Sequence, residues 1–215
     1  MLTKEQLWGS RIDNPTTSMI SSKKQRDTQF PKCVIGFDRD GIINECRSGP
    51  ISTADDFVPI SGALDAIAFL RTHGHKIVII FDQPLISQGL MVPATVDSVN
   101  QHMLKLLGEH GCPSIDGIYY STTNLPKVDI WAKPNPAMFK RAENEQGVSF
   151  RQGGYYVGDS IEDLEAAVAI KATPVLIKTG NYAETLAKLN TFAKRKLKSK
   201  VQIFNTLQDF ARSLF

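Results

Sequence analysis

The chain alternates short apolar runs with longer segments whose apolar residues recur every three or four positions. Runs such as 33–37 (CVIGF) and 76–81 (KIVIIF) have the length and apolar continuity of strands that are buried on both faces. Segments 63–74 and 94–111 have the periodicity of amphipathic helices. The same pattern predicts further strands at 116–120, 154–159, 173–180 and 200–205, and further helices at 135–147, 161–170 and 206–215.

This alternation predicts an α/β fold, a Rossmann-like parallel sheet with helices on both faces. Ligands of such sheets bind beyond the carboxyl ends of the strands. The polar residues that follow each apolar run are therefore the candidate functional residues. Residues 1–31 are polar, and we expect them to form a flexible N-terminal arm to a domain that spans residues 32–215.

Composition bounds the class of protein. With 215 residues, 42% of them hydrophobic, the chain is long enough for one sizeable core. The net charge of +3 is too mild to indicate a nucleic-acid binder by itself, and for the basic run at 193–200 a solvated helix end is the favoured interpretation. Three cysteines without C-x-x-C spacing indicate neither a disulfide framework nor a zinc knuckle.

The sequence has no apolar run of the roughly 18 residues that span a bilayer, and its N-terminus lacks the apolar core of a signal peptide. We therefore expect a cytoplasmic protein without a membrane partner.

Acidic residues stand at the ends of two predicted strands. Asp38 and Asp40 follow the first strand, and Asp159 and Asp163 follow a later one. Crowded carboxylates repel one another unless a cation neutralises them, and oxygen ligands suit a hard ion such as Mg²⁺. Such a site can hold a phosphate oxygen on the metal, while one carboxylate attacks phosphorus and another protonates the leaving oxygen.

Lys133 could add positive charge to this edge of the sheet. It precedes a predicted helix, for which we expect Asn135 as the N-cap and Pro136 at the first helical position. Taken singly, D-x-D is common in turns, G-D-x-x-x-D is common at helix starts, and K-P says little. Their order along the chain, each after a different strand, favours a phosphoryl-transfer site.

These residues resemble the haloacid dehalogenase (HAD) superfamily of phosphatases. Within it, "FDRDGIIN", "DGIYY" and "KPNPAMF" resemble subfamily IIIA, the heptose-bisphosphate and histidinol-phosphate phosphatases, which have no large cap domain. The resemblance implies an HAD-like fold. It also implies that Asp38 is the nucleophile, Asp40 the general acid and base, and Lys133 the group that stabilises the phosphoryl group. Asp159 would bind Mg²⁺ together with Asp38 and the Asp40 carbonyl, and Asp163 would orient the site.

The chain departs from this family after the second strand. Phe81 stands where the family has a phosphate-binding threonine, and a phenyl ring cannot donate the hydroxyl hydrogen bond. The resemblance leaves the backbone of Phe81 and Asp82, with Gln83, as phosphate-binding groups. Arg47, in the segment after the first strand, is expected to face the substrate.

A second departure lies before Lys133. The segment "STTNLPKVDIWAKP" has no Cys or His where the heptose-bisphosphate enzymes carry a zinc loop, and Ala132 stands where they carry an arginine. We therefore expect no zinc. Because that arginine holds the substrate's remote phosphate in the family, heptose bisphosphate is disfavoured as the substrate.

Three functions stay open at this stage. The leading hypothesis is a Mg²⁺-dependent phosphomonoesterase that acts on a small phosphorylated metabolite of the sugar-phosphate type through an aspartyl-phosphate, as a monomer or weak homodimer. The second is a 3′-end phosphatase of nucleic acid, for which the basic run would suit. The third is a non-catalytic HAD-fold binding protein, because Phe81 replaces the threonine.

Overall fold

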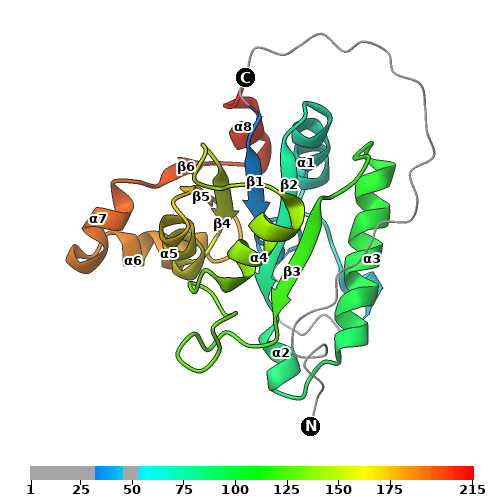
Figure 1. Cartoon of the computed structure of the whole chain (residues 1–215), viewed down its shortest axis with the longest axis horizontal. Coiled ribbons are helices and arrows are strands. Elements are labelled where there is room, and N and C mark those ends of the chain that lie inside the picture. Colours follow the sequence, from blue (N-terminus) through cyan, green and yellow to red (C-terminus); the bar gives the residue numbers. More distant parts are fainter. Residues whose placement is uncertain (1–31, 46–52) are drawn as a thin grey trace.

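The structure, a computed structural model, describes residues 32–45 and 53–215 (Figure 1). The predicted arm at 1–31 and the predicted substrate contact Arg47 lie outside the described residues. Six parallel strands form one sheet in the order β3-β2-β1-β4-β5-β6. Their bounds are β1 Val34–Phe37, β2 Lys76–Asp82, β3 Gly117–Ser121, β4 Tyr155–Gly158, β5 Thr173–Ile177 and β6 Gln202–Phe204.

Helices cover both faces of the sheet, as the sequence predicts. On one face, α1 (Ala63–Thr72), α3 (Pro93–Glu109) and α8 (Leu207–Arg212) pack on the larger core cluster. On the other face, α4 (Ala137–Gln146) and α5 (Ile161–Ala169) pack on a second cluster. The shorter elements are α2 Pro84–Ser87, α6 Tyr182–Leu189, α7 Arg195–Lys198 and the 3₁₀ turns Ala54–Asp56 and Phe192–Lys194.

Strand alternation assigns each core residue to a face. In β2, Ile77, Ile79 and Phe81 belong to the α1/α3 cluster, whereas Val78 and Ile80 belong to the α4/α5 cluster. Because both faces of β2 are buried, its sequence is apolar at consecutive positions rather than at every second one. In the described part of the chain, the segment from β1 to α1 holds one 3₁₀ turn and no second domain, so the predicted absence of a large cap is confirmed there.

The strand order reverses between β1 and β4. The chain moves outward from β1 to β2 and β3, and then from β4 to β5 and β6. Such a switch point leaves a crevice at the carboxyl ends of the two central strands. Asp38 and Asp159 directly follow these two strands. No helix of the described residues has the length and apolar character needed to cross a membrane.

The predicted start of α4 is wrong by one residue. The helix begins at Ala137, and Pro136 rather than Asn135 is its N-cap. The Asn135 amide instead donates to the carbonyl oxygens of Pro126 (2.8 Å) and Asp129 (3.1 Å), which fastens the preceding loop. Sequence reasoning also missed α6, whose buried Thr185 and Leu189 lie four residues apart on one face.

Gly36, in the central strand β1, gives a test of this packing. A Cβ at residue 36 would lie 2.7 Å from the Tyr156 ring and 3.2 Å from the Phe150 ring. We expect Gly36→Ala to lower the free energy of unfolding by about 1–3 kcal/mol, because extra methyl groups in a packed core force their neighbours to shift. Urea unfolding measures the change.

The matched control is Gly108→Ala in α3. No atom lies within 4 Å of a Cβ built there, and alanine favours a helix by roughly 0.5–1 kcal/mol over glycine. The control is therefore expected to be neutral or stabilising. Equal effects of the two substitutions would contradict the packing described for β1.

Candidate active site

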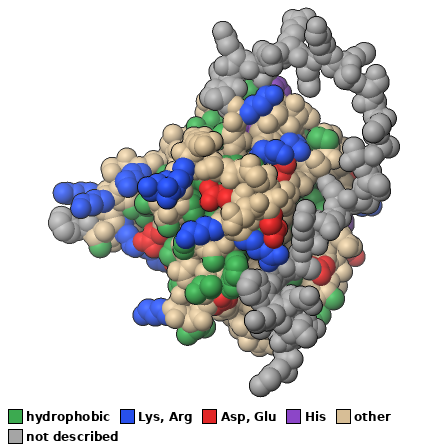
Figure 2. All heavy atoms as spheres, in the orientation of Figure 1, with side chains coloured by type: hydrophobic (Ala, Val, Ile, Leu, Met, Phe, Trp, Pro, Cys, Tyr) green, Lys and Arg blue, Asp and Glu red, His purple; other side chains and the backbone are tan. Residues whose placement is uncertain are grey.

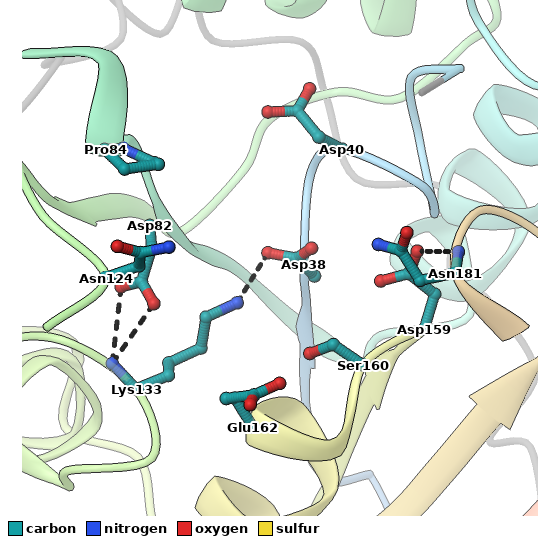
Figure 3. Close-up of a pocket in the computed structure, with 10 residues that line it drawn as sticks. All are labelled: Asp38, Asp40, Asp82, Pro84, Asn124, Lys133, Asp159, Ser160, Glu162 and Asn181. Atoms are coloured by element: carbon teal, nitrogen blue, oxygen red, sulfur yellow. Dashed lines mark hydrogen bonds and ion pairs between the residues drawn. The ribbon is translucent and has the colours of Figure 1, made fainter. Parts of the chain in front are cut away.

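A pocket of about 340 Å³ opens at the carboxyl end of the central strands (Figure 3). Asp38 lies between Lys133 and Asp159 in this view, and Asp40 lies on the far side of Asp38 from Glu162. The structure therefore brings together residues that are up to 143 positions apart in sequence, from Asp38 to Asn181. Sequence reasoning did not identify Asn124, Ser160, Glu162 or Asn181, which also line the pocket.

Lys133 is the positive centre of the site. Its Nζ lies 2.8 Å from Asp38 Oδ1 and 2.6 Å from Asp163 Oδ1, and the side chain is only 5% exposed. Burial on its own lowers the pKa of Lys133, but the neighbouring charges of Asp163 and Asp38 outweigh it and hold the pKa well above its usual value. The lysine is therefore a permanent cation that ties β1 to α5.

Asp163 orients its neighbours rather than facing the pocket. Its Oδ1 accepts from Lys133, and its Oδ2 accepts from the Ser160 amide (3.0 Å) and the Ser160 hydroxyl (2.6 Å). Ser160 is in turn the N-cap of α5 and accepts from the Asp163 amide. This reciprocal capping fixes the first turn of the helix. Both Asp163 oxygens are thus engaged by protein groups.

Asp159 approaches Asp38 from β4. Oxygens of Asp38, Asp159 and Asp163 lie within 4.8 Å of one another. Burial raises the pKa of Asp38 well above its usual value, against the pull of Lys133. Burial, followed by the charge of Asp163, raises the pKa of Asp159 to about 7. Three buried carboxylates around one ammonium leave excess negative charge, which is the charge pattern of a site for a hard divalent cation.

Two glycines let the backbone close around Asp159. A Cβ on Gly41 would lie 2.2 Å from Asp159 Oδ2, and a Cβ on Gly180 would lie 1.9 Å from the same atom. Both residues have positive φ, +88° and +51°. The Asn181 amide then donates to Asp159 Oδ2 over 2.6 Å. Any side chain at either glycine would displace the carboxylate from the pocket.

Asp40 is held by groups that sequence reasoning missed. Arg39 Nη2 donates to Asp40 Oδ2 (2.7 Å), Arg39 Nε donates to Oδ1 (3.2 Å), and Asn44 Nδ2 also donates to Oδ1 (3.1 Å). The Arg39 side chain is fully buried, whereas that of Asp40 is 31% exposed. The sequence signal for this Arg39–Asp40 ion pair is an arginine between two aspartates at the end of a buried strand.

Of the three residues at the end of β2 that were expected to bind phosphate, one lines the pocket. Asp82 lines it, and both of its oxygens accept from the Lys133 amide at 3.3 and 3.2 Å. Burial, opposed by Lys133, raises the pKa of Asp82 to about 7. Phe81 points into the core on the α1/α3 face. Gln83 is buried outside the pocket lining, and its amide donates to the Ser121 carbonyl (2.8 Å).

The basic run lies apart from these strand ends, in the turn and helix that follow α6. Figure 2 shows Lys and Arg side chains gathered at the end of the molecule where α6 and α7 lie. Lys194 pairs with Glu165 of α5, and Lys188 pairs with Glu184 at 2.7 Å. Part of this charge is therefore neutralised within the chain.

Comparison with known proteins gives consistent matches. Residues 130–207 match the family model described as HAD-hydrolase-like. The D-glycero-β-D-manno-heptose-1,7-bisphosphate 7-phosphatase of Pseudomonas putida is 35% identical over 151 residues, which is 70% of this chain and 85% of the relative. The enzyme of the same name from Neisseria meningitidis serogroup A is 28% identical over 179 residues, 83% of this chain and 92% of the relative.

Solved structures agree with these matches. The crystal structure of D,D-heptose 1,7-bisphosphate phosphatase from B. bronchiseptica, complexed with magnesium and phosphate, aligns with a TM-score of 0.76 at 27% identity. The match covers 85% of this chain and 97% of that one. With the parallel sheet and the converging strand ends, these findings show that the chain belongs to the HAD-like hydrolases and is a phosphatase related to the heptose-bisphosphate phosphatases.

Proposed function

We propose that the protein is a Mg²⁺-dependent phosphomonoesterase that hydrolyses a small sugar phosphate through an aspartyl-phosphate on Asp38. The observation that carries this proposal is the placement of Asp38. Its carboxylate lines the pocket while one oxygen is held 2.8 Å from Lys133 Nζ. Among the hydrogen bonds of the described residues, the other oxygen, Oδ2, accepts none. It is the oxygen that would attack phosphorus.

The neighbouring groups supply the remaining steps. As Asp38 Oδ2 bonds to phosphorus, the ester oxygen leaves and takes a proton from Asp40. Asp40 then removes a proton from water, which attacks the phosphorus and releases phosphate and free Asp38. Lys133 lies beside Asp38 on the α4 side and would bind a phosphoryl oxygen, offsetting negative charge as the transfer proceeds. One acid thus serves both half-reactions.

The donor set fits Mg²⁺. Asp38 and Asp159, with the Asp40 main-chain carbonyl, would hold the ion, because oxygen donors are what this hard cation prefers. Asp163 is already saturated by Lys133 and Ser160. When bound, the ion supplies positive charge that offsets the carboxylates and a phosphoryl oxygen. The magnesium and phosphate of the B. bronchiseptica structure support this choice of metal.

The pocket favours a monophosphate over a bisphosphate. Lys133 is the one cationic side chain among the pocket-lining residues of the described part, against Asp38, Asp40, Asp82, Asp159 and Glu162. Ala132 is fully buried, and its side chain offers no charge to a second phosphate. We therefore propose a sugar monophosphate as the substrate class, in contrast to the bisphosphate in the names of the relatives.

Replacement of the nucleophile tests the mechanism. Asp38→Asn is expected to reduce phosphate release by at least about a thousandfold, because the amide cannot form the acyl phosphate. Phosphate release from p-nitrophenyl phosphate and a panel of sugar monophosphates, with Mg²⁺ or with chelator, measures it. Chelator should abolish turnover of the wild type.

Asp65→Asn, an exposed aspartate of α1 outside the pocket, is the matched control and should keep full activity. Undiminished hydrolysis by Asp38→Asn would contradict the mechanism. A silent wild type across the whole panel would favour the non-catalytic alternative. A steep fall in affinity with salt, for an oligonucleotide 3′-phosphate in preference to the sugar panel, would favour the nucleic-acid enzyme.

Asp82 gives a separate test, through the pH dependence of KM. Its raised pKa of about 7 means that the carboxyl is mostly neutral below pH 7 and charged above it. Charged Asp82 repels a phosphoryl dianion, so KM is expected to rise by roughly tenfold as pH increases through 7, equivalent to about 1.4 kcal/mol of repulsion. Asp82→Asn should flatten that rise.

The substrate's own titration is the same for both proteins, so the difference between the two KM profiles isolates Asp82. Steady-state kinetics from pH 5.5 to 8.5 with one sugar monophosphate gives both profiles. Parallel profiles for wild type and Asp82→Asn would show that the carboxyl does not act on the bound phosphate.

A further inference from the structure

Phe81 replaces a hydroxyl residue at a phosphatase strand end, yet its ring lies outside the pocket. The sheet register explains where the ring lies. Phe37 pairs with Ile79, so Phe81, two residues further along β2, is level with Arg39, two residues beyond Phe37. Residues two apart in a strand share a face. Phe81 shares the α1/α3 face with Ile79, and Arg39 reaches the same face, because it contacts the Phe81 ring and Asn100 of α3.

The Arg39 guanidinium lies over the face of the Phe81 ring. The Arg39 guanidinium carbon lies 4.0 Å from the centre of the Phe81 ring. The ring is supported from the other neighbouring strand by Tyr120, its register partner, with ring centres 5.5 Å apart and planes at 24°. Both Arg39 and Phe81 are essentially inaccessible to solvent. A cation on an aromatic face is most favourable in such a desolvated setting.

Arg39 also has polar partners in two directions. It holds both Asp40 oxygens, and its Nη1 donates to Asn100 Oδ1 of α3 over 3.2 Å. Asn100 is fully buried, and within the described residues its Nδ2 has no hydrogen-bond partner. The one hydrogen bond of the Asn100 side-chain amide among the described residues is therefore the one that its oxygen accepts from Arg39. Three contacts thus fix the Arg39 guanidinium: the Phe81 ring packs on its face, Asn100 accepts a hydrogen bond from Nη1, and Asp40 accepts hydrogen bonds from Nε and Nη2.

We propose that Phe81 is a positioning residue for Asp40, acting through Arg39. This inference rests on the proposed function, in which Asp40 is the general acid and base. A threonine at position 81 would offer no aromatic face, so the Arg39 guanidinium would lose the surface on which it packs and its position would be less well fixed. The planar fork of arginine transmits that position to both carboxylate oxygens. The phenyl ring is therefore a functional part of the site although it touches no substrate.

This role predicts a dependence on the leaving group. Phenyl phosphate releases a phenol whose pKa, about 10 like that of tyrosine, makes protonation by Asp40 important. The p-nitrophenyl ester has the same ring but a far better leaving group, which needs less assistance. The ratio of kcat/KM for p-nitrophenyl phosphate to kcat/KM for phenyl phosphate therefore reports the placement of Asp40. This ratio covers steps only up to release of the alcohol.

The test compares Phe81→Leu with wild type in the presence of Mg²⁺. Leucine keeps an apolar side chain but removes the ring face. We expect the kcat/KM ratio to rise by about tenfold or more, because general acids contribute roughly 10²–10⁴-fold and depend on placement. Phe210→Leu is the matched control and should leave the ratio unchanged, because Phe210 is another fully buried phenylalanine, which belongs to α8 and packs on Tyr155 of β4.

A double-mutant cycle shows whether the effect passes through Arg39. Arg39→Lys removes the planar fork and should raise the ratio by itself, and adding Phe81→Leu to it should raise the ratio no further. Additive effects would overturn the inference, as would an unchanged ratio in Phe81→Leu or an equal change in Phe210→Leu. If Phe81→Leu does not fold, Phe81→Met provides the same comparison. A wild type that hydrolyses neither ester and none of the sugar monophosphates would instead overturn the proposed function.

Discussion

The structure of the site depends on one ammonium group shared by two buried carboxylates. Lys133 Nζ contacts Asp38 and Asp163 at 2.8 and 2.6 Å. Asp38 follows β1, Asp163 belongs to α5, and Lys133 lies in the segment between β3 and α4. Burying two carboxylates together is unfavourable, and the ammonium between them makes the arrangement tolerable. Removing the lysine would leave uncompensated buried charge at the junction of β1 and α5.

The position of the Lys133 ammonium also gives the four aspartates Asp38, Asp40, Asp159 and Asp163 different environments. Asp163 is occupied by the ammonium and by the cap of α5, so it is structural. Asp38 is held at one oxygen and open at the other. Asp159, enclosed by Gly41 and Gly180, faces Asp38 and carries the charge that a metal ion would offset. Asp40 pairs with Arg39, whereas Lys133 pairs with Asp38 and Asp163.

Much of this arrangement can be predicted from the sequence. Apolar strands alternating with amphipathic helices predict the parallel sheet, and parallel topology brings Asp38 and Asp159 to one edge without any knowledge of contacts. The direction of side chains at the strand ends cannot be predicted in this way. Phe81 ends the apolar run that Asp82 and Gln83 follow, but its ring points into the core, and the bond from the Gln83 main-chain amide to the Ser121 carbonyl takes Gln83 out of the pocket lining. The start of α4 was mispredicted because Asn135 bonds to the loop before it.

The replacement at position 81 shows why a motif position and a side-chain role differ. From sequence, the loss of a hydroxyl donor implies a weakened site. In the structure, the ring at that position packs on the guanidinium of Arg39, and this guanidinium donates hydrogen bonds to Asp40. The ring gives the buried guanidinium a favourable contact, because a desolvated cation is costly unless it has partners. Long-range pairs of this kind depend on register, which a single sequence does not reveal.

The central claim is that Asp38 becomes phosphorylated during turnover. The most direct measurement mixes the wild-type protein with p-nitrophenyl phosphate and Mg²⁺, quenches with acid on the millisecond scale, and maps phosphoryl adducts on peptides by mass spectrometry. The account predicts one phosphoryl group on Asp38 that forms and decays at rates consistent with turnover. Turnover without an adduct on Asp38, or with the adduct on another residue, would contradict it.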